Sequence, residues 1–172
     1  GIKMNDENNI NKLYSIVIDF QDYLLPSGDN YAFKEFTIIY TKPKKMIYYY
    51  TYVTSPLCPW RYLSSEYKTY YRKLLNSYGV KWEVGTVDFV FMRQQFQAIF
   101  KDADIIYVRN SRIKYILKNY YPNDEYNIIS LDSLGYNDEV QLVSNCLNHN
   151  HNLNYCTEQT AQYMTNWIIK NS

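Results

Sequence analysis

Two cysteines and both histidines of the chain lie within eleven residues near the C-terminus. They are Cys146, His149, His151 and Cys156, spaced as Cys-x2-His-x-His-x4-Cys. Zinc prefers four nitrogen or sulfur ligands in a tetrahedron, and this segment supplies four. The spacing predicts a structural zinc site, although it matches no familiar zinc knuckle. The alternative stays open that the cysteines are small buried hydrophobes and the histidines lie in a loop.

Basic residues gather in two places, although the net charge of the chain is only +1. A partner such as nucleic acid must therefore be recognised locally, by where the charges sit. One group lies between residues 101 and 118, and the stretch that follows it, 122–139, carries acids and no base. The other group lies around a tyrosine-rich segment, where phosphate binding and base stacking would combine. The candidate nucleic-acid-binding residues are Arg109, Asn110, Arg112, Lys114, Lys68 and Arg72. An ordinary solvated helix face is the alternative.

The compartment and the class of protein follow from the remaining composition. Three cysteines, an odd number, favour a reducing environment over a disulfide framework, so we expect an intracellular protein, cytoplasmic or nuclear. No apolar run reaches the length of a membrane span, so no membrane partner is expected. The 21 tyrosines are typical of AT-rich codon usage, as in an invertebrate or a virus.

Hydrophobic periodicity predicts the elements that must position these residues. Short turns join the first three strands, which predicts an antiparallel meander, and helices then alternate with strands, which predicts parallel pairing. The expected fold is α/β, with three layers and a mixed sheet flanked by helices. Residues 1–12 are expected to form a flexible leader and 13–172 a single domain. Strands are predicted at 14–20, 32–40, 46–53, 104–108 and 126–131, and helices at 64–77, 88–101, 111–120, 139–145 and 157–169.

This element order is that of the RNase H-like fold, and the middle of the chain resembles DEDD-type 3′–5′ exonucleases. Those enzymes have a Gly-Ile/Val step, a helix, and a strand that runs into His-Asn with an Asp four residues later. The corresponding segments are Gly79-Val80, 88–101 and Asp104–Lys114.

The chain also resembles a poorly described set of invertebrate and viral proteins. They share five short motifs in the same order along the chain. Here the motifs are Asp19-Phe20-Gln21, Lys34-Glu35, Pro59-Trp60, Gly79-Val80-Lys81-Trp82 and the Cys/His segment from Cys146 to Cys156.

The exonuclease resemblance implies two divalent metals held by four carboxylates, which activate water for phosphodiester cleavage. Only the first carboxylate is present, as Asp19 at the end of the first strand. The other three positions hold Gln21, Lys114 and Thr160. Lys114 is either an ion-pair partner of Asp19 in place of metal, or a solvent-facing helix residue.

Two further carboxylates are candidates for catalysis if the domain is active with magnesium or manganese. Glu35 is expected roughly opposite Asp19 in the meander, and Glu158 lies close to Thr160 in sequence. Asp22 reads as a solvated loop residue.

Three functions fit these residues. The first is a catalytically degenerate exonuclease-like domain that binds nucleic acid, RNA in preference to DNA, and acts as a viral factor. The second is an interaction module that antagonises or recruits a host protein. The third is an active nuclease with a metal site rebuilt from Asp19, Glu35 and Glu158. The resemblance favours the first.

Overall fold

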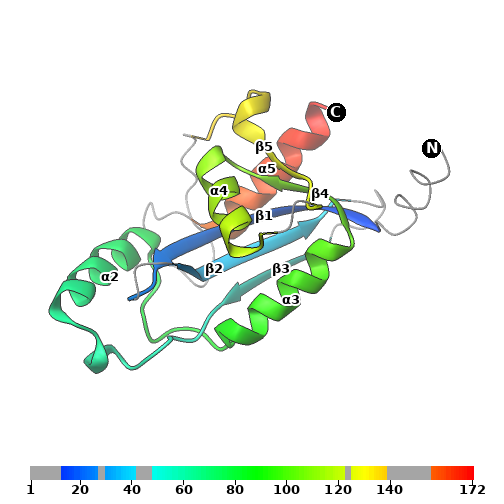
Figure 1. The fold of residues 1–172 in the computed structure, drawn as a ribbon. Helices are drawn as coiled ribbons and strands as arrows, with labels where there is room; N and C mark the ends of the chain where they lie inside the picture. The colour runs from blue at the N-terminus through cyan, green and yellow to red at the C-terminus, as the bar shows by residue number, and fades with distance from the viewer. Residues whose placement is uncertain (1–12, 27–29, 42–47, 123–124, 139–155) are drawn as a thin grey trace.

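A five-stranded mixed sheet forms the centre of the computed structural model, which describes residues 13–26, 30–41, 48–122, 125–138 and 156–172. The strand order is β3-β2-β1-β4-β5 (Figure 1). The first three strands pair antiparallel, and β4 and β5 add in parallel beside β1. The predicted α/β class and the meander followed by parallel strands are therefore confirmed. The strands are β1 Tyr14–Leu24, β2 Tyr31–Tyr40, β3 Tyr48–Val53, β4 Ala103–Val108 and β5 Ile128–Ser130.

Side chains of the N-cap residues cap the starts of α2, α3 and α4. Ser64, Asp88 and Asn110 each accept a hydrogen bond from a backbone N–H three residues on, at the starts of α2, α3 and α4. Gly79 ends α2 in the left-handed conformation, with φ 71°. The helices are α2 Ser65–Tyr78, α3 Phe89–Lys101, α4 Ser111–Tyr120 and α5 Thr157–Lys170, with 3-10 turns η1 Trp60–Tyr62 and η2 Leu131–Leu134. The predicted leader and the helix at 139–145 lie outside the described residues.

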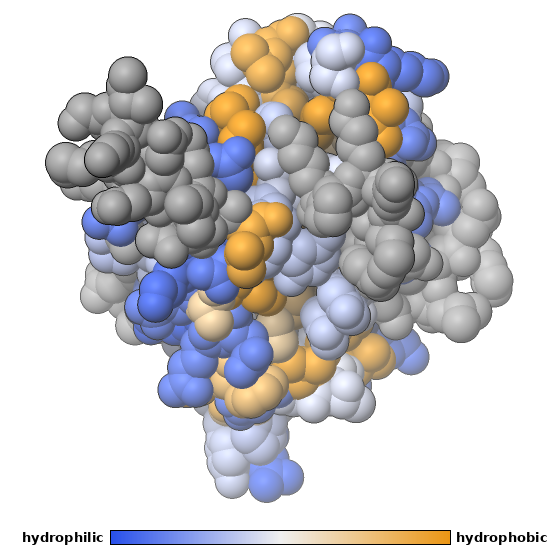
Figure 2. Space-filling view, turned by 90° about the vertical axis from the view of Figure 1, so that its right-hand side faces the viewer, coloured by the Kyte–Doolittle hydropathy of each residue, from blue (hydrophilic) through white to orange (hydrophobic). Residues whose placement is uncertain are grey.

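The two faces of the sheet pack against different helices. Alternate residues of β1 such as Ile18 and Phe20 contact a core built with α3 and α4. Val17, on the other face, packs with Ala161 and Met164 of α5. The sheet therefore lies between two helical layers (Figure 1). On the face that Figure 2 shows, the apolar surface of the described residues is divided into small patches between hydrophilic side chains.

A third cluster closes the far end of β1. Tyr23 contacts Tyr71 of α2 and the buried Trp82, and this cluster anchors α2 to the sheet. Strand β1 extends four residues past the predicted end at Phe20, because Gln21 and Asp22 are buried strand residues rather than part of a turn. Strand β5 is shorter than predicted, since η2 follows it directly.

Candidate functional site

Asp19 and Arg109 meet because of the register between β1 and β4. Val17 lies beside Tyr107 in this parallel pair, so two residues further on Asp19 lies beside Arg109 on the same face. The Asp19 side chain has no solvent exposure, and Arg109 Nε donates to its Oδ1 at 3.0 Å. Lys114 was expected to be either the ion-pair partner of Asp19 or a solvent-facing helix residue. Arg109 is the cation that contacts Asp19, and Lys114 lies half-buried in the first turn of α4.

A second carboxylate approaches Arg109 from the chain segment after β5. Arg109 Nη1 lies 3.4 Å from Asp138 Oδ1, and Asn110 Nδ2 donates to Asp138 Oδ2 at 2.6 Å. Gly135 ends η2 with a φ of 100°, a conformation that other residues rarely adopt, and this turn precedes the segment that carries Asp138. The guanidinium of Arg109 thus lies between two carboxylates, Asp19 and Asp138.

Burial raises the pKa of the Asp19 carboxyl to about 7, and Arg109 opposes that rise. The pKa of Arg109 is itself raised, since Asp19 and Asp138 favour its charged form more than burial opposes it. The guanidinium of Arg109 therefore compensates the charge of this buried carboxylate.

Glu35 caps helix α5. The register pairs Glu35 with Gln21, which lies two residues after Asp19 in β1. Glu35 and Asp19 are therefore on the same face of the sheet. Its Oε1 accepts from the backbone N–H of Thr157 at 3.1 Å and from the Thr157 hydroxyl at 2.7 Å. Because that hydroxyl donates to Glu35, the hydroxyl of Thr37 at 2.9 Å is the donor to Thr157. A carboxylate at a helix N-terminus is favourable to the helix dipole.

We expect Glu35→Ala to lower the free energy of unfolding by about 1–3 kcal/mol, because it leaves two buried donors of Thr157 unsatisfied. Glu35→Gln keeps an acceptor and removes only the charge, so its loss should be smaller, about 0.5–1 kcal/mol. Urea unfolding of both variants measures this. Asp104→Asn, at an exposed carboxylate, is the control and should match the parent. Equal stability of Glu35→Ala and the parent would contradict the capping role.

The carboxylates of the described residues do not fit a pair of divalent metals at this site. Asp19 has a guanidinium at 3.0 Å, and Glu35 is bound to the start of α5. Thr160 is buried on α5 and Glu158 is half-buried in its first turn. In the part of the chain that the structure describes, no three His, Cys, Asp or Glu side chains are grouped so as to hold a metal ion. The cation of Arg109 would repel a divalent ion beside Asp19.

Arg112 forms an ion pair with Asp22, so the expectation of a solvated loop residue at Asp22 is wrong. Asp22 is buried in β1, and both of its oxygens accept from Arg112 at 3.0 and 2.7 Å. Such a two-point contact fixes α4 against the end of β1. Two of the candidate nucleic-acid-binding residues, Arg109 and Arg112, therefore engage carboxylates of the domain itself, and Asn110 binds Asp138 and caps α4.

The other basic candidates lie on α2. Arg72 is exposed and Lys68 is half-buried, and the Arg72 guanidinium lies 5.7 Å from the ring centre of Trp60. The tyrosines of this helix differ in exposure. Tyr71 is buried in the core, whereas Tyr70 is exposed on the surface.

The zinc prediction concerns residues that lie mostly outside the described part of the chain. Cys146, His149 and His151 lie outside the described residues, and Cys156 is buried at the start of α5. Zinc binding stays a prediction, which metal analysis of the purified domain would test. Within the described ranges, no helix is both long enough and apolar enough to span a bilayer.

Sequence reasoning assigned no contact to Asp138, Thr157 or the buried Lys34. The Lys34 ammonium donates to three backbone carbonyls, those of Thr54, Trp82 and Val84, at 3.1, 2.7 and 2.5 Å. Burial lowers its pKa to about 8. The acidic stretch that follows the basic one was the available signal for Asp138, and the Lys34-Glu35 motif was the available signal for Lys34.

Comparison of the chain with protein-family models and with curated proteins identifies no relative. The function must therefore be argued from the residues and their geometry.

Proposed function

We propose that this chain is a catalytically inactive domain of the RNase H-like, DEDD-exonuclease type that binds nucleic acid, RNA in preference to DNA. The observation that carries the proposal is the Arg109 guanidinium between Asp19 and Asp138. The element order and the mixed sheet support the fold assignment. Function is argued from the site, because a shared fold alone does not imply activity.

The ion pair supplies charge compensation that metals supply in an active enzyme. Two-metal nucleases need carboxylates free to neutralise two dications. Here one cation fixed by the chain compensates Asp19, and Gln21 offers no charge where the resemblance places a carboxylate. A buried carboxylate that is paired with a guanidinium keeps the fold intact without metal, because neither charge is left uncompensated.

The proposed binding surface lies on α2 and the 3-10 turn before it. Lys68, Arg72 and Lys73 supply positive charge, and Trp60 and the exposed Tyr70 supply aromatic surface. Proteins that bind single-stranded nucleic acid typically place positively charged side chains along the phosphate backbone and aromatic side chains where the bases stack. Arg109 and Arg112 contribute to the fold in this account rather than to the ligand.

Charge reversal on α2 should weaken RNA binding. For Lys68→Glu/Arg72→Glu we expect affinity for a fluorescein-labelled single-stranded RNA to fall about 10-fold or more, with a shallower salt dependence, because each lost phosphate contact reduces the slope by about 0.7. Fluorescence anisotropy across a salt series measures both quantities.

The matched control is Lys118→Glu/Lys170→Glu, which reverses two exposed lysines on other helices. It changes the net charge equally and should weaken binding much less. Equal losses in the two double variants would remove α2 as the site, and absence of RNA binding by the parent would overturn the proposal.

A protein partner is the second candidate function. Val84, Val90 and Phe91 are exposed around the first turn of α3, at 42%, 62% and 54% of their full surface. A contiguous exposed apolar patch is a feature of protein-binding surfaces, and these three side chains lie close together in sequence. A domain that fails to bind RNA at physiological salt, and whose binding to a host or viral protein is lost in Phe91→Ser, would support this function instead.

A further inference from the structure

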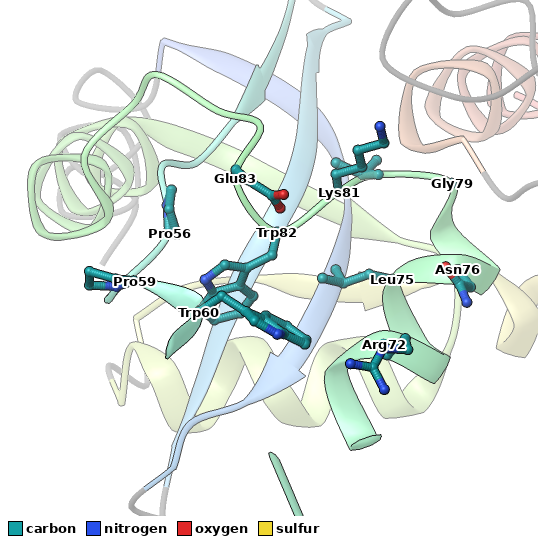
Figure 3. A pocket seen from close by; sticks show the side chains of 11 residues that line it. Pro56, Pro59, Trp60, Arg72, Leu75, Asn76, Gly79, Lys81, Trp82 and Glu83 are labelled. Atoms are coloured by element: carbon teal, nitrogen blue, oxygen red, sulfur yellow. The ribbon is translucent and has the colours of Figure 1, made fainter. Parts of the chain in front are cut away.

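A pocket with a cavity volume of about 560 Å³ opens between α2 and the two loop segments that flank it. That volume lies in the range of small-ligand sites. Figure 3 shows its lining, in which residues of α2 face residues from before and after that helix. The lining includes the side chains of Trp60, Arg72, Lys81, Trp82 and Glu83.

The floor of the pocket is held rigidly by the fold. Trp82 is 4% exposed, stacks on Tyr71 with ring centres 4.9 Å apart, and donates from Nε1 to the Cys58 carbonyl at 2.9 Å. The Lys34 ammonium binds the carbonyls of Trp82 and Val84, on either side of Glu83. Glu83 is thereby positioned by backbone contacts on both sides, while its own side chain is exposed.

The chemistry of the lining combines three kinds of group. Trp60 is only partly buried and lies edge-to-face with Trp82, at 5.9 Å between ring centres. Arg72 lies 5.7 Å from the centre of the Trp60 ring, and Lys81 adds a second exposed cation. Glu83 adds a carboxylate to the same lining (Figure 3). A ligand that matches has a flat ring, an anionic group and hydrogen-bond donors.

We infer that this pocket binds one nucleotide of a single RNA strand, with its base against Trp60 and its phosphate at Arg72. The inference rests on the proposed function and gives it a defined site. Stacking on an aromatic side chain accepts any base, and splayed bases are read on their hydrogen-bonding edges. Glu83 is the group that would discriminate among them.

An ionised carboxylate only accepts hydrogen bonds, so it selects bases that present donors. Guanine offers two adjacent donors, the ring N1–H and the amino group, which match the two oxygens of Glu83. Adenine and cytosine each offer one amino group. Uracil offers one N–H between two carbonyls, and those carbonyls repel a carboxylate. The expected order of affinity is guanine first, adenine and cytosine next, and uracil last.

The test uses fluorescein-labelled single-stranded RNA and competition by the four nucleoside 5′-monophosphates, read by fluorescence anisotropy. Trp60→Ala should weaken RNA binding about 5- to 100-fold, the range for loss of one stacked base, and Trp60→Phe should retain most of it. Tyr115→Ala, which removes an exposed ring on α4, is the matched control and should have no effect. Glu83→Gln should abolish the preference for guanosine over uridine monophosphate, and Asp104→Asn should leave it unchanged.

The outcomes separate the pocket from the proposed function. If RNA binds but Trp60→Ala behaves like Tyr115→Ala, or if the parent does not distinguish the four nucleotides, the pocket inference is overturned and RNA binding stands. If the parent binds no RNA, both are overturned. Glu83 is exposed, so Glu83→Gln tests the inference even if Trp60→Ala impairs folding.

Discussion

Arg109→Met should lower the free energy of unfolding by about 3–5 kcal/mol at pH 8, the range for a buried ion pair that loses one partner. The reason is that Asp19 has no solvent exposure, so without the guanidinium it must either hold an uncompensated buried charge or take up a proton from solution at pH 8. Methionine preserves much of the side-chain length, so the loss reports on charge more than on packing. Urea unfolding followed by circular dichroism measures the change.

A double-mutant cycle isolates the pair. The double variant Asp19→Asn/Arg109→Met should lose about 1–3 kcal/mol less free energy of unfolding than the sum of the two single losses. Each single variant leaves the partner's charge uncompensated, whereas the double variant removes both charges. Strictly additive losses would show that Arg109 does not compensate Asp19.

The pH dependence of stability gives an independent check on Asp19. Its folded pKa of about 7 lies above the ordinary value, so between pH 4 and 7 the folded state binds more protons than the unfolded state. The contribution of Asp19 to stability is therefore fully present below about pH 4 and declines as the pH rises to about 7. The stability difference between the parent and Asp19→Asn should follow this decline and level off above pH 7. A difference that does not change with pH would contradict the raised pKa.

Gly85→Ala should have the second large effect, a loss of about 3 kcal/mol or more, because two penalties act together. Gly85 has a φ of 132°, which an L side chain rarely adopts, and a Cβ there would collide with the carbonyl of Thr54. The segment it belongs to carries the Val84 carbonyl that Lys34 binds and leads from Glu83 to α3. Thermal unfolding measures the loss, and the pocket beside Glu83 should be distorted with it.

Gly135→Ala is the matched control for Gly85→Ala. Its φ of 100° is also positive, but a Cβ there meets no atom within 4 Å. Its loss should be about 1–2 kcal/mol, the conformational strain alone. Equal losses of stability at the two glycines would show that the Thr54 backbone moves away from a Cβ at position 85 at little energetic cost.

The sequence predicted the helices well because their ends depend on local chemistry. Ser64, Asp88, Asn110 and Gly79 act through hydrogen bonds and backbone angles within a few residues, so their effect can be read without the fold. The first, second and fourth strands were also found, since their buried faces are rich in β-branched and aromatic residues.

The polar contacts of the site depended on strand register, which the sequence does not display. Arg109 rather than Lys114 contacts Asp19 because β4 pairs with β1 in one particular alignment. The register shift after Gln21 leaves Lys34 as the extra residue of β2, and its ammonium turns to the carbonyls of Thr54, Trp82 and Val84. One residue of slip would have exchanged the faces of these side chains.

The most direct measurement of the central proposal is an incubation of the purified domain with end-labelled single- and double-stranded RNA and DNA, with magnesium, with manganese and with neither. The proposed surface on α2 predicts binding of RNA, and the Arg109–Asp19 ion pair predicts no metal-dependent shortening of any substrate. Asp19→Ala should then look like the parent in the cleavage assay. Shortening that requires metal and disappears in Asp19→Ala would contradict the proposal and show that this carboxylate serves catalysis.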